Sequence, residues 1–212
     1  MKKLMNVTAV MLLLTAPFVL MSCKKSDNNN VNPSGTTTTQ TLTDYEKESL
    51  LHIREEEKLA RDVYTYLHGT WGLYIYSNIS SSEQRHMDAV LSLLNTYNIT
   101  DPVGNNAAGI FKNVDLQNLY NTLIAKGDVS LVNALEVGAT IEDLDLYDLK
   151  IAKEKISNSD IISVYDNLAK GSRNHMREFY SQLKSNGSTY TPQYITKEEF
   201  EAIINSPKEM GN

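Results

Sequence analysis

Six side chains able to bind metal ions lie in four separate segments of this 212-residue chain, each at a position where a helix would present its apolar face. They are Glu57, Glu83, His86, Glu142, Asp145 and His175. Four carboxylates balance the charge of two divalent cations, and two imidazoles add one neutral nitrogen for each ion. A carboxylate left unpaired in an apolar interior is costly. The set therefore predicts a carboxylate site for two metal ions inside a bundle of helices.

The first of these segments shows the pattern most clearly. Its apolar residues recur three and four positions apart, which places them on one face of a helix: Leu50, Ile53, Ala60, Tyr64 and Leu67. Glu57 occupies a position of the same stripe. Glu56 lies close to the stripe and is the alternative ligand, whereas Glu55 is predicted on the solvated side of the helix.

Glu83 and His86 form a Glu-x-x-His pair, whose two side chains lie on one face of a helix. One such pair is weak evidence, because it occurs by chance in many helical proteins. The prediction depends on the fact that all six candidate ligands fall on the apolar faces of four helices. In the third segment, Glu136 is a weaker alternative to Glu142.

The elements that must position these residues are four long helices and two short ones. The long helices are expected from Thr43 to His68–Gly69, from Ser80–Ser82 to Tyr97, from Val129–Ser130 through Ala152, and from Asp160 to Leu183, and the short ones over Val114–Ala125 and Lys197–Ile204. Residues 71–78 are interpreted as an aromatic turn. Since no segment has a strand pattern, the sequence predicts an all-α bundle over residues 44–205, followed by a tail at 206–212.

The N-terminus carries the pattern of an exported lipoprotein. A short basic stretch followed by an apolar run through Leu20 is typical of a secretory signal peptide. Residues 20–23, Leu-Met-Ser-Cys, resemble the cleavage box of bacterial lipoproteins, so we expect a signal peptide over 1–22 and lipidation of Cys23. The alternative is an ordinary signal peptide or a single membrane anchor. The polar residues 23–43 predict a flexible tether.

These features predict an extracytoplasmic protein held on a bacterial membrane. Lys24 follows the cysteine where an acidic inner-membrane retention signal would stand, so the outer membrane is expected in a cell with two membranes. Because acidic residues outnumber basic ones by 26 to 20, nucleic acid is excluded as a partner. Cys23 is the only cysteine, which rules out a disulfide within the chain. The expected partners are the membrane and an unidentified electron donor, and a homodimer is compatible with the pattern.

The segment from Glu57 to Tyr66, Glu-Lys-Leu-Ala-Arg-Asp-Val-Tyr-Thr-Tyr, resembles the first ligand helix of the ferritin-like superfamily, and of rubrerythrins especially. In those proteins a tyrosine follows the ligating glutamate by seven residues, which favours Glu57 over Glu56 and brings Tyr64 next to the metals. Over about residues 48–204, the chain resembles a bacterial and archaeal family of ferritin-like domains of unknown function. Four motifs carry this wider resemblance: Arg54-Glu-Glu-Glu-Lys-Leu-Ala-Arg-Asp-Val-Tyr64, Ser82-Glu-Gln-Arg-His-Met-Asp-Ala-Val90, Gly171-Ser-Arg-Asn-His-Met-Arg-Glu-Phe179 and Tyr190-Thr-Pro-Gln-Tyr194.

The resemblance implies a ferritin-like four-helix bundle with a short extra helix between the second and third long helices and a short C-terminal helix. One residue departs from its pattern. Ferritin-like sites usually carry a second Glu-x-x-His on the last long helix, but here Ser172 stands three residues before His175. Either Asp145 supplies the missing carboxylate, or the second metal position is weakened or lost. Around the ligands, Tyr64, Ser172, Asn174 and Glu56 are expected to support the carboxylates, with Arg173 beside them.

The function expected from these residues is oxidation or reduction at a centre of two iron ions, or of iron and manganese, that reacts with dioxygen or peroxide. A second hypothesis is a metal-binding or structural domain of the cell envelope without turnover, since no segment of the chain is a recognisable electron carrier. Iron storage is a third hypothesis, and a membrane tether on every subunit disfavours the closed shell that storage needs.

Overall fold

The computed structural model describes residues 41–210, and within that range the chain forms six helices and no strand. The helices are α1 (Asp44–Trp71), α2 (Tyr74–Thr96), α3 (Val114–Gly127), α4 (Leu131–Lys153), α5 (Ser159–Ser185) and α6 (Lys197–Ile204). The all-α prediction is confirmed, including both short helices. The expected signal peptide, Cys23 and nearly all of the expected tether lie outside the described residues.

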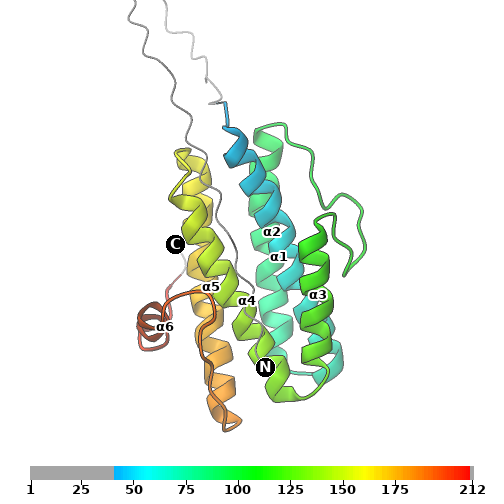
Figure 1. Cartoon of the computed structure of the whole chain (residues 1–212), viewed down its shortest axis with the longest axis vertical. Coiled ribbons are helices and arrows are strands. Elements are labelled where there is room, and N and C mark those ends of the chain that lie inside the picture. The colour runs from blue at the N-terminus through cyan, green and yellow to red at the C-terminus, as the bar shows by residue number, and fades with distance from the viewer. Residues whose placement is uncertain (1–40, 211–212) are drawn as a thin grey trace, which may run out of the picture. The chain divides into compact units, whose positions relative to one another are not determined.

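The four long helices pack as two pairs, α1 with α2 and α4 with α5 (Figure 1). The pairs meet through contacts of α2 with α5 and of α1 with α4, while α3 lies against α1 and α4, and α6 lies against α5. All five apolar residues of the predicted first stripe are at most 2% exposed. The interior between the two pairs is therefore the place where residues from four helices meet.

Side chains at the helix starts supply the hydrogen bonds that the first backbone N–H groups lack. Thr43 and Glu46 form a capping box at the start of α1, where the Glu46 N–H donates to the Thr43 hydroxyl over 3.2 Å. Ser130 caps α4 and Asn158 caps α5. Three of the four helices that carry candidate ligands thus have a side-chain cap, whereas α2 has none.

The prediction of an aromatic turn at residues 71–78 is wrong. Only Gly72 and Leu73 separate α1 from α2, because Gly72 takes a left-handed conformation with φ 70° and reverses the chain at once. The expected helix start at residues 80–82 lies inside α2. The hydroxyls of Ser80 and Ser81 both donate to the carbonyl of Ser77, so these serines bond within the helix instead of capping it.

The prediction of Glu55 as a solvated side chain is also wrong. Glu55 is 4% exposed, and its carboxylate accepts hydrogen bonds from the backbone N–H groups of Lys112 over 2.6 Å and Asn113 over 3.1 Å. The segment before α3 crosses this side of α1, and its free N–H groups need an acceptor there. Glu55 therefore fastens α3 to α1.

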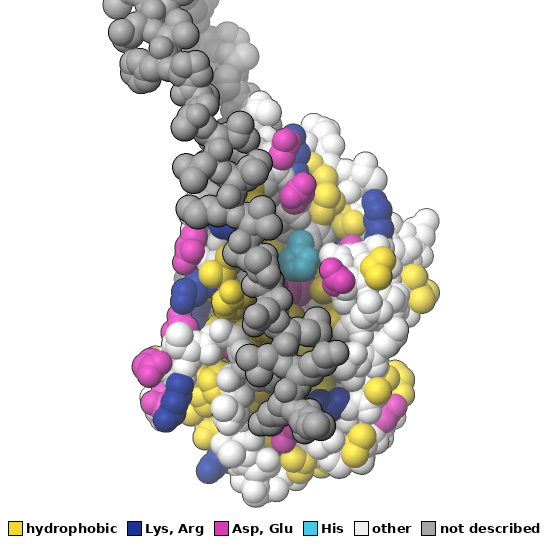
Figure 2. Space-filling model, viewed as in Figure 1, with side chains coloured by type: hydrophobic (Ala, Val, Ile, Leu, Met, Phe, Trp, Pro, Cys, Tyr) yellow, Lys and Arg dark blue, Asp and Glu magenta, His cyan; other side chains and the backbone are white. Residues whose placement is uncertain are grey.

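The residues after α6, predicted as a tail, lie against α5 as far as they are described. Glu209 forms ion pairs with Arg173 over 2.6 Å and with Arg177 over 3.1 Å. Within residues 41–210, none of the helices combines the length and apolar character needed to span a membrane. Where Figure 2 shows described residues, acidic and basic side chains are interspersed on this face.

Candidate metal centre

Four helices bring the six predicted ligands to the bundle interior. α1 contributes Glu57, α2 contributes Glu83 and His86, α4 contributes Glu142 and Asp145, and α5 contributes His175. The four carboxylates are 0–2% exposed, whereas His175 is 7% exposed and the side chain of His86 is 12% exposed. The predicted residues thus come from four separate helices and are almost fully shielded from water.

Glu83 lies at the middle of this cluster. One of its oxygens is 2.7 Å from Nδ1 of His86, and the other is 2.9 Å from Nδ1 of His175. A second carboxylate faces each imidazole: Glu57 lies 3.1 Å from Nδ1 of His86, and Glu142 lies 3.4 Å from Nδ1 of His175. The residues therefore form two groups of three that share Glu83, and the ligand atoms of each group lie within 4.8 Å of one another.

Many of these buried atoms lack a hydrogen-bond partner among residues 41–210. The unpartnered atoms are both oxygens of Glu83, both oxygens of Asp145, Oε2 of Glu142, Nδ1 of His175 and Oε1 of Glu56. The short separations around Glu83 do not have the alignment of hydrogen bonds. Because buried polar atoms are normally paired, so many unpartnered ligand atoms in one place fit the donor set of bound cations.

The charges of the cluster are balanced only by shared protons. Burial raises the pKa of Glu57 to about 7 against the opposing effect of His86. Burial raises the pKa of Asp145 well above its usual range, and neighbouring carboxylates add to that rise. Burial acts on Glu83 in the same direction, but the imidazolium charges of His175 and His86 outweigh it and hold the pKa of Glu83 low.

The carboxylates of the cluster in turn raise the pKa values of both histidines. Burial disfavours the charged form of His175, but the carboxylates of Glu83 and Glu142 outweigh it and raise its pKa to about 10. The pKa of His86 is raised in the same way by Glu83 and Glu57, against burial. Protons therefore provide in the metal-free protein the positive charge that cations would bring.

Tyr64 holds one carboxylate of the cluster in place, as predicted for a ligand-supporting residue. Its hydroxyl donates to Oε1 of Glu142 over 2.6 Å. Its ring packs between Tyr76, at 6.3 Å between centroids, and Phe179, at 5.3 Å. The hydrogen bond from the Tyr64 hydroxyl orients Glu142, whose other oxygen, Oε2, faces His175.

The other predicted supporting residues lie differently. Ser172 is buried, but its hydroxyl donates to the Leu168 carbonyl within α5. Asn174 points to the C-terminal segment, where its amide donates to the carbonyl of Glu209. The prediction that Asn174 supports the carboxylates is not met, because one residue before His175 lies about 100° around the helix from it. Glu56 is also buried, but it forms a group with His52 of α1 and Asp148 of α4, which are not among the six candidate ligands.

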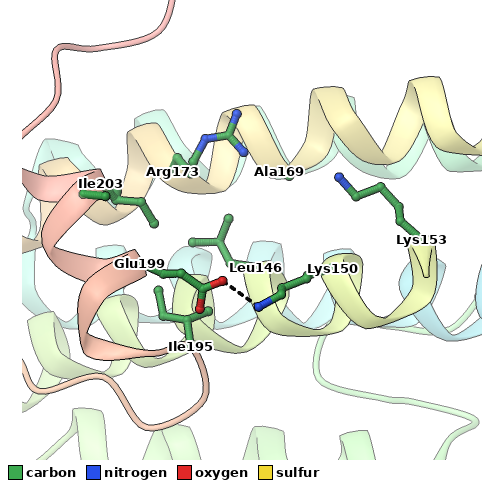
Figure 3. Close-up of a pocket in the computed structure, with 9 residues that line it drawn as sticks. Leu146, Lys150, Lys153, Ala169, Arg173, Ile195, Glu199 and Ile203 are labelled. Carbon is green, nitrogen blue, oxygen red and sulfur yellow. Dashed lines mark hydrogen bonds and ion pairs between the residues drawn. The ribbon is translucent and has the colours of Figure 1, made fainter.

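The surface pocket between α4, α5 and α6 differs from the cluster in its electrostatics (Figure 3). It has a volume of about 260 Å³. Its basic side chains are all paired with carboxylates: Lys150 with Glu199, Lys153 with Asp166 and Arg173 with Glu209, each over 2.6 Å. Arg173 therefore forms its ion pair at the surface. The prediction that it supports the ligands is not met. Glu136, the weaker alternative to Glu142, pairs with Lys126 outside the cluster.

Sequence reasoning missed the role of Gly171. A Cβ at this position of α5 would lie 2.5 Å from both Cε1 and Nε2 of His86, so only glycine leaves room for that imidazole. The available signal was a glycine in the interior of a long helix, which costs about 0.5–1 kcal/mol relative to alanine.

We expect Gly171→Ala to lower the affinity for divalent metal about 10-fold or more, the scale on which displaced outer partners of ligands act. The added methyl group displaces the His86 ring although alanine favours the helix. Titration with Mn²⁺ measures the effect. Gly69→Ala is the matched control, because a Cβ on Gly69 of α1 meets nothing within 4 Å. Equal affinities in both variants would show that the His86 ring moves without consequence.

Comparison with known proteins places the whole cluster inside a family match. A family model described as "Uncharacterized protein domain (DUF2202)" matches residues 46–207. "Uncharacterized protein MJ0754" of Methanocaldococcus jannaschii is 57% identical over 172 residues, which cover 81% of this chain and 93% of that protein. The crystal structure of "hypothetical protein MJ0754 from Methanococcus jannaschii DSM 2661" is similar with a TM-score of 0.79 and 57% identity, over 80% of this chain and 97% of that one. All six candidate ligands lie within the family match.

Proposed function

This chain belongs to the DUF2202 family, and we propose that it carries a carboxylate centre for two divalent metal ions inside a ferritin-like bundle. The observation that carries the proposal is the set of unpartnered ligand atoms around Glu83. Four buried carboxylates with two imidazoles are a stable arrangement only if positive charge joins them. The pairing of α1 with α2 and of α4 with α5 supports the ferritin-like arrangement.

The cluster divides into two positions with similar ligands. Glu57 and His86 would hold one ion, Glu142 and His175 would hold the other, and Glu83 would contact both. Asp145 is buried with both oxygens unpartnered, and it feels the charges of Glu56, Glu57, Glu142 and Glu83. This supports Asp145 as the carboxylate that replaces the acid missing at Ser172. A mixed set of imidazole and carboxylate donors suits iron or manganese.

Two iron ions held here would supply the electrons for a reaction with dioxygen or peroxide. The chain's own residues fix the ligands and exclude water. Tyr64 orients Glu142, and the rings of Tyr76 and Phe179 fill the space behind it. Turnover needs an external electron donor, which we propose as a separate partner.

The proposed location rests on the pattern of the N-terminal sequence. We infer that Cys23 is lipidated and that residues 23–43 hold the bundle away from a membrane, the outer membrane in a cell with two. The basic, apolar and Leu-Met-Ser-Cys stretches of the N-terminus support this inference.

Metal binding without turnover is a second candidate function. Ser172 favours it, because its hydroxyl is bonded to the Leu168 carbonyl and provides no carboxylate to the second position. A centre with fewer charged ligands would bind metal and fold without supporting redox chemistry.

Metal analysis of protein produced with iron tests the proposal. We expect at least two iron ions per chain, and a loss of metal in both Glu57→Ala and His86→Ala. Glu136→Ala is the control, since Glu136 pairs with Lys126 outside the cluster. An unchanged metal content in both Glu57→Ala and His86→Ala would contradict the proposed metal centre. Peroxide consumption in the presence of a reductant, faster with metal-loaded than with metal-free protein, separates an oxidoreductase from a metal-binding domain.

A further inference from the structure

A second group of ligand side chains lies beside the buried cluster, toward solvent. His52 and Glu56 are one turn apart on α1, and Asp148 faces them from α4. Nε2 of His52 is 3.9 Å from Oε2 of Glu56 and 3.5 Å from Oδ2 of Asp148. One ligand atom from each residue lies within 4.8 Å of the other two. None of the three belongs to the six ligands of the proposed centre.

Glu56 is the residue that points to a bound ion. It is 2% exposed, and its Oε1 has no hydrogen-bond partner among residues 41–210. Within the same range, the ion pair nearest to it is the long contact with His52. The Asp148 carboxylate adds a second negative charge on the same side. Two neighbouring carboxylates, one of them buried, are unfavourable when both are ionised, unless a proton or a metal cation is bound between them.

The exposure of the three side chains decreases from the surface toward the interior. His52 is 39% exposed, Asp148 is 27% exposed and Glu56 is 3% exposed, counting side chains. His52 and Asp148 line a surface hollow of about 230 Å³ with Tyr45, Ser49 and Ile151. An ion can therefore reach this group from water.

The same group adjoins the buried cluster on both helices. Glu56 directly precedes Glu57 on α1, and Asp148 lies one turn after Asp145 on α4. The surface group is therefore adjacent to the buried centre along both helices.

We propose that His52, Glu56 and Asp148 bind a divalent transition-metal ion at the surface and pass it to the buried centre through the Glu56 carboxylate. The imidazole nitrogen favours a transition metal over magnesium or calcium. Three protein ligands leave coordination positions for water, which suits an ion that must exchange. Delivery depends on the proposed function, whereas binding of the surface ion does not.

Titration of the full chain with Co²⁺ tests the inference, with equilibrium dialysis for the number of bound ions and visible absorption for the rate of loading. The wild type should bind three ions per chain. His52→Ala and Asp148→Asn should each bind two, and their buried centre should load at least tenfold more slowly. His68→Ala is the matched control, because His68 is the one histidine outside both groups. Thermal melting verifies that each variant is folded.

Three bound ions and a wild-type loading rate in both His52→Ala and Asp148→Asn would overturn the inference. An unchanged rate with only two ions would overturn delivery. Glu83→Gln separates the two proposals, since it removes the carboxylate shared by both buried positions and should keep the surface ion. A wild type that binds a single ion, lost in His52→Ala, would contradict the buried centre and still support the surface site.

Discussion

Glu83→Gln is expected to lose both metal ions, whereas Glu57→Gln is expected to lose mainly one. The two oxygens of Glu83 face different imidazoles, at 2.7 and 2.9 Å, so this single carboxylate belongs to both positions. Glu57 faces only His86. Replacement by glutamine keeps the shape and removes the negative charge. The affinity for each ion should fall by more than the ~10–100-fold typical of changes to outer partners of ligands.

Elemental analysis after dialysis against a dilute metal buffer measures this difference. Glu136→Gln provides the control, because it removes an equally charged side chain that pairs with Lys126 on α3. It should retain the wild-type metal content. If Glu83→Gln kept one ion per chain with unchanged affinity, Glu83 would belong to one position only and the shared arrangement would be wrong.

Removal of metal is expected to reverse the pH dependence of stability. Burial raises the pKa of Glu57 to about 7, so its contribution to stability is present below the usual carboxyl pKa and is lost as the pH rises toward 7. The pKa of His175 is raised to about 10 by carboxylates that outweigh burial. That contribution is present below about pH 6.5 and is lost as the pH rises toward 10. Metal-free protein should therefore be less stable at pH 8 than at pH 5.5.

Bound metal should act in the opposite direction. Metal replaces protons on its ligands, so binding becomes tighter as the pH rises. An ion at 1,000 times its dissociation constant stabilises the folded state by about 4 kcal/mol, which corresponds to roughly 10 °C in Tm for a domain of this size. The gain in Tm from Mn²⁺ should thus be larger at pH 8 than at pH 5.5. Differential scanning calorimetry of metal-free and loaded protein measures it, with Glu83→Gln expected to show little gain. Equal gains at both pH values would argue against ligands that exchange protons for metal.

Helical periodicity was sufficient to predict five residues that form two ligand groups around Glu83, while Asp145 is buried but belongs to neither group. Each of Glu57, Glu83 and Glu142 stands at an apolar position of its own helix, and burial of that face takes the carboxylate to the interior with it. Periodicity left Glu56 as an alternative to Glu57, and only the resemblance to the first ligand helix of ferritin-like proteins favoured Glu57. Periodicity could not show that Glu83 lies between two imidazoles, because that depends on how α2 meets α5.

The errors arose where a distant segment determines the surroundings of a residue. The pattern of α1 contains nothing about residues 112–113, whose backbone N–H groups donate to the Glu55 carboxylate. Asn174 and Arg173 were predicted beside the ligands, but Glu209, in a segment assigned to a tail, binds both of them. The group of His52, Glu56 and Asp148 requires two helices to pack, so no single stretch of sequence indicates it.

Local sequence also misled at the start of α2. Serines are frequent at helix starts, and Ser80 and Ser81 were assigned that role. Their hydroxyls bond to the Ser77 carbonyl, which satisfies them inside a helix that had begun at Tyr74. The left-handed conformation of Gly72 made this early start possible.

Anomalous X-ray diffraction from crystals grown with iron, recorded on both sides of the iron absorption edge, tests the buried centre most directly. We expect two peaks inside the bundle, one between Glu57 and His86 and the other between Glu142 and His175, with Glu83 in contact with both. Crystals soaked in a chelator should lose them. An interior without anomalous density in protein that is saturated with iron would contradict the proposed centre.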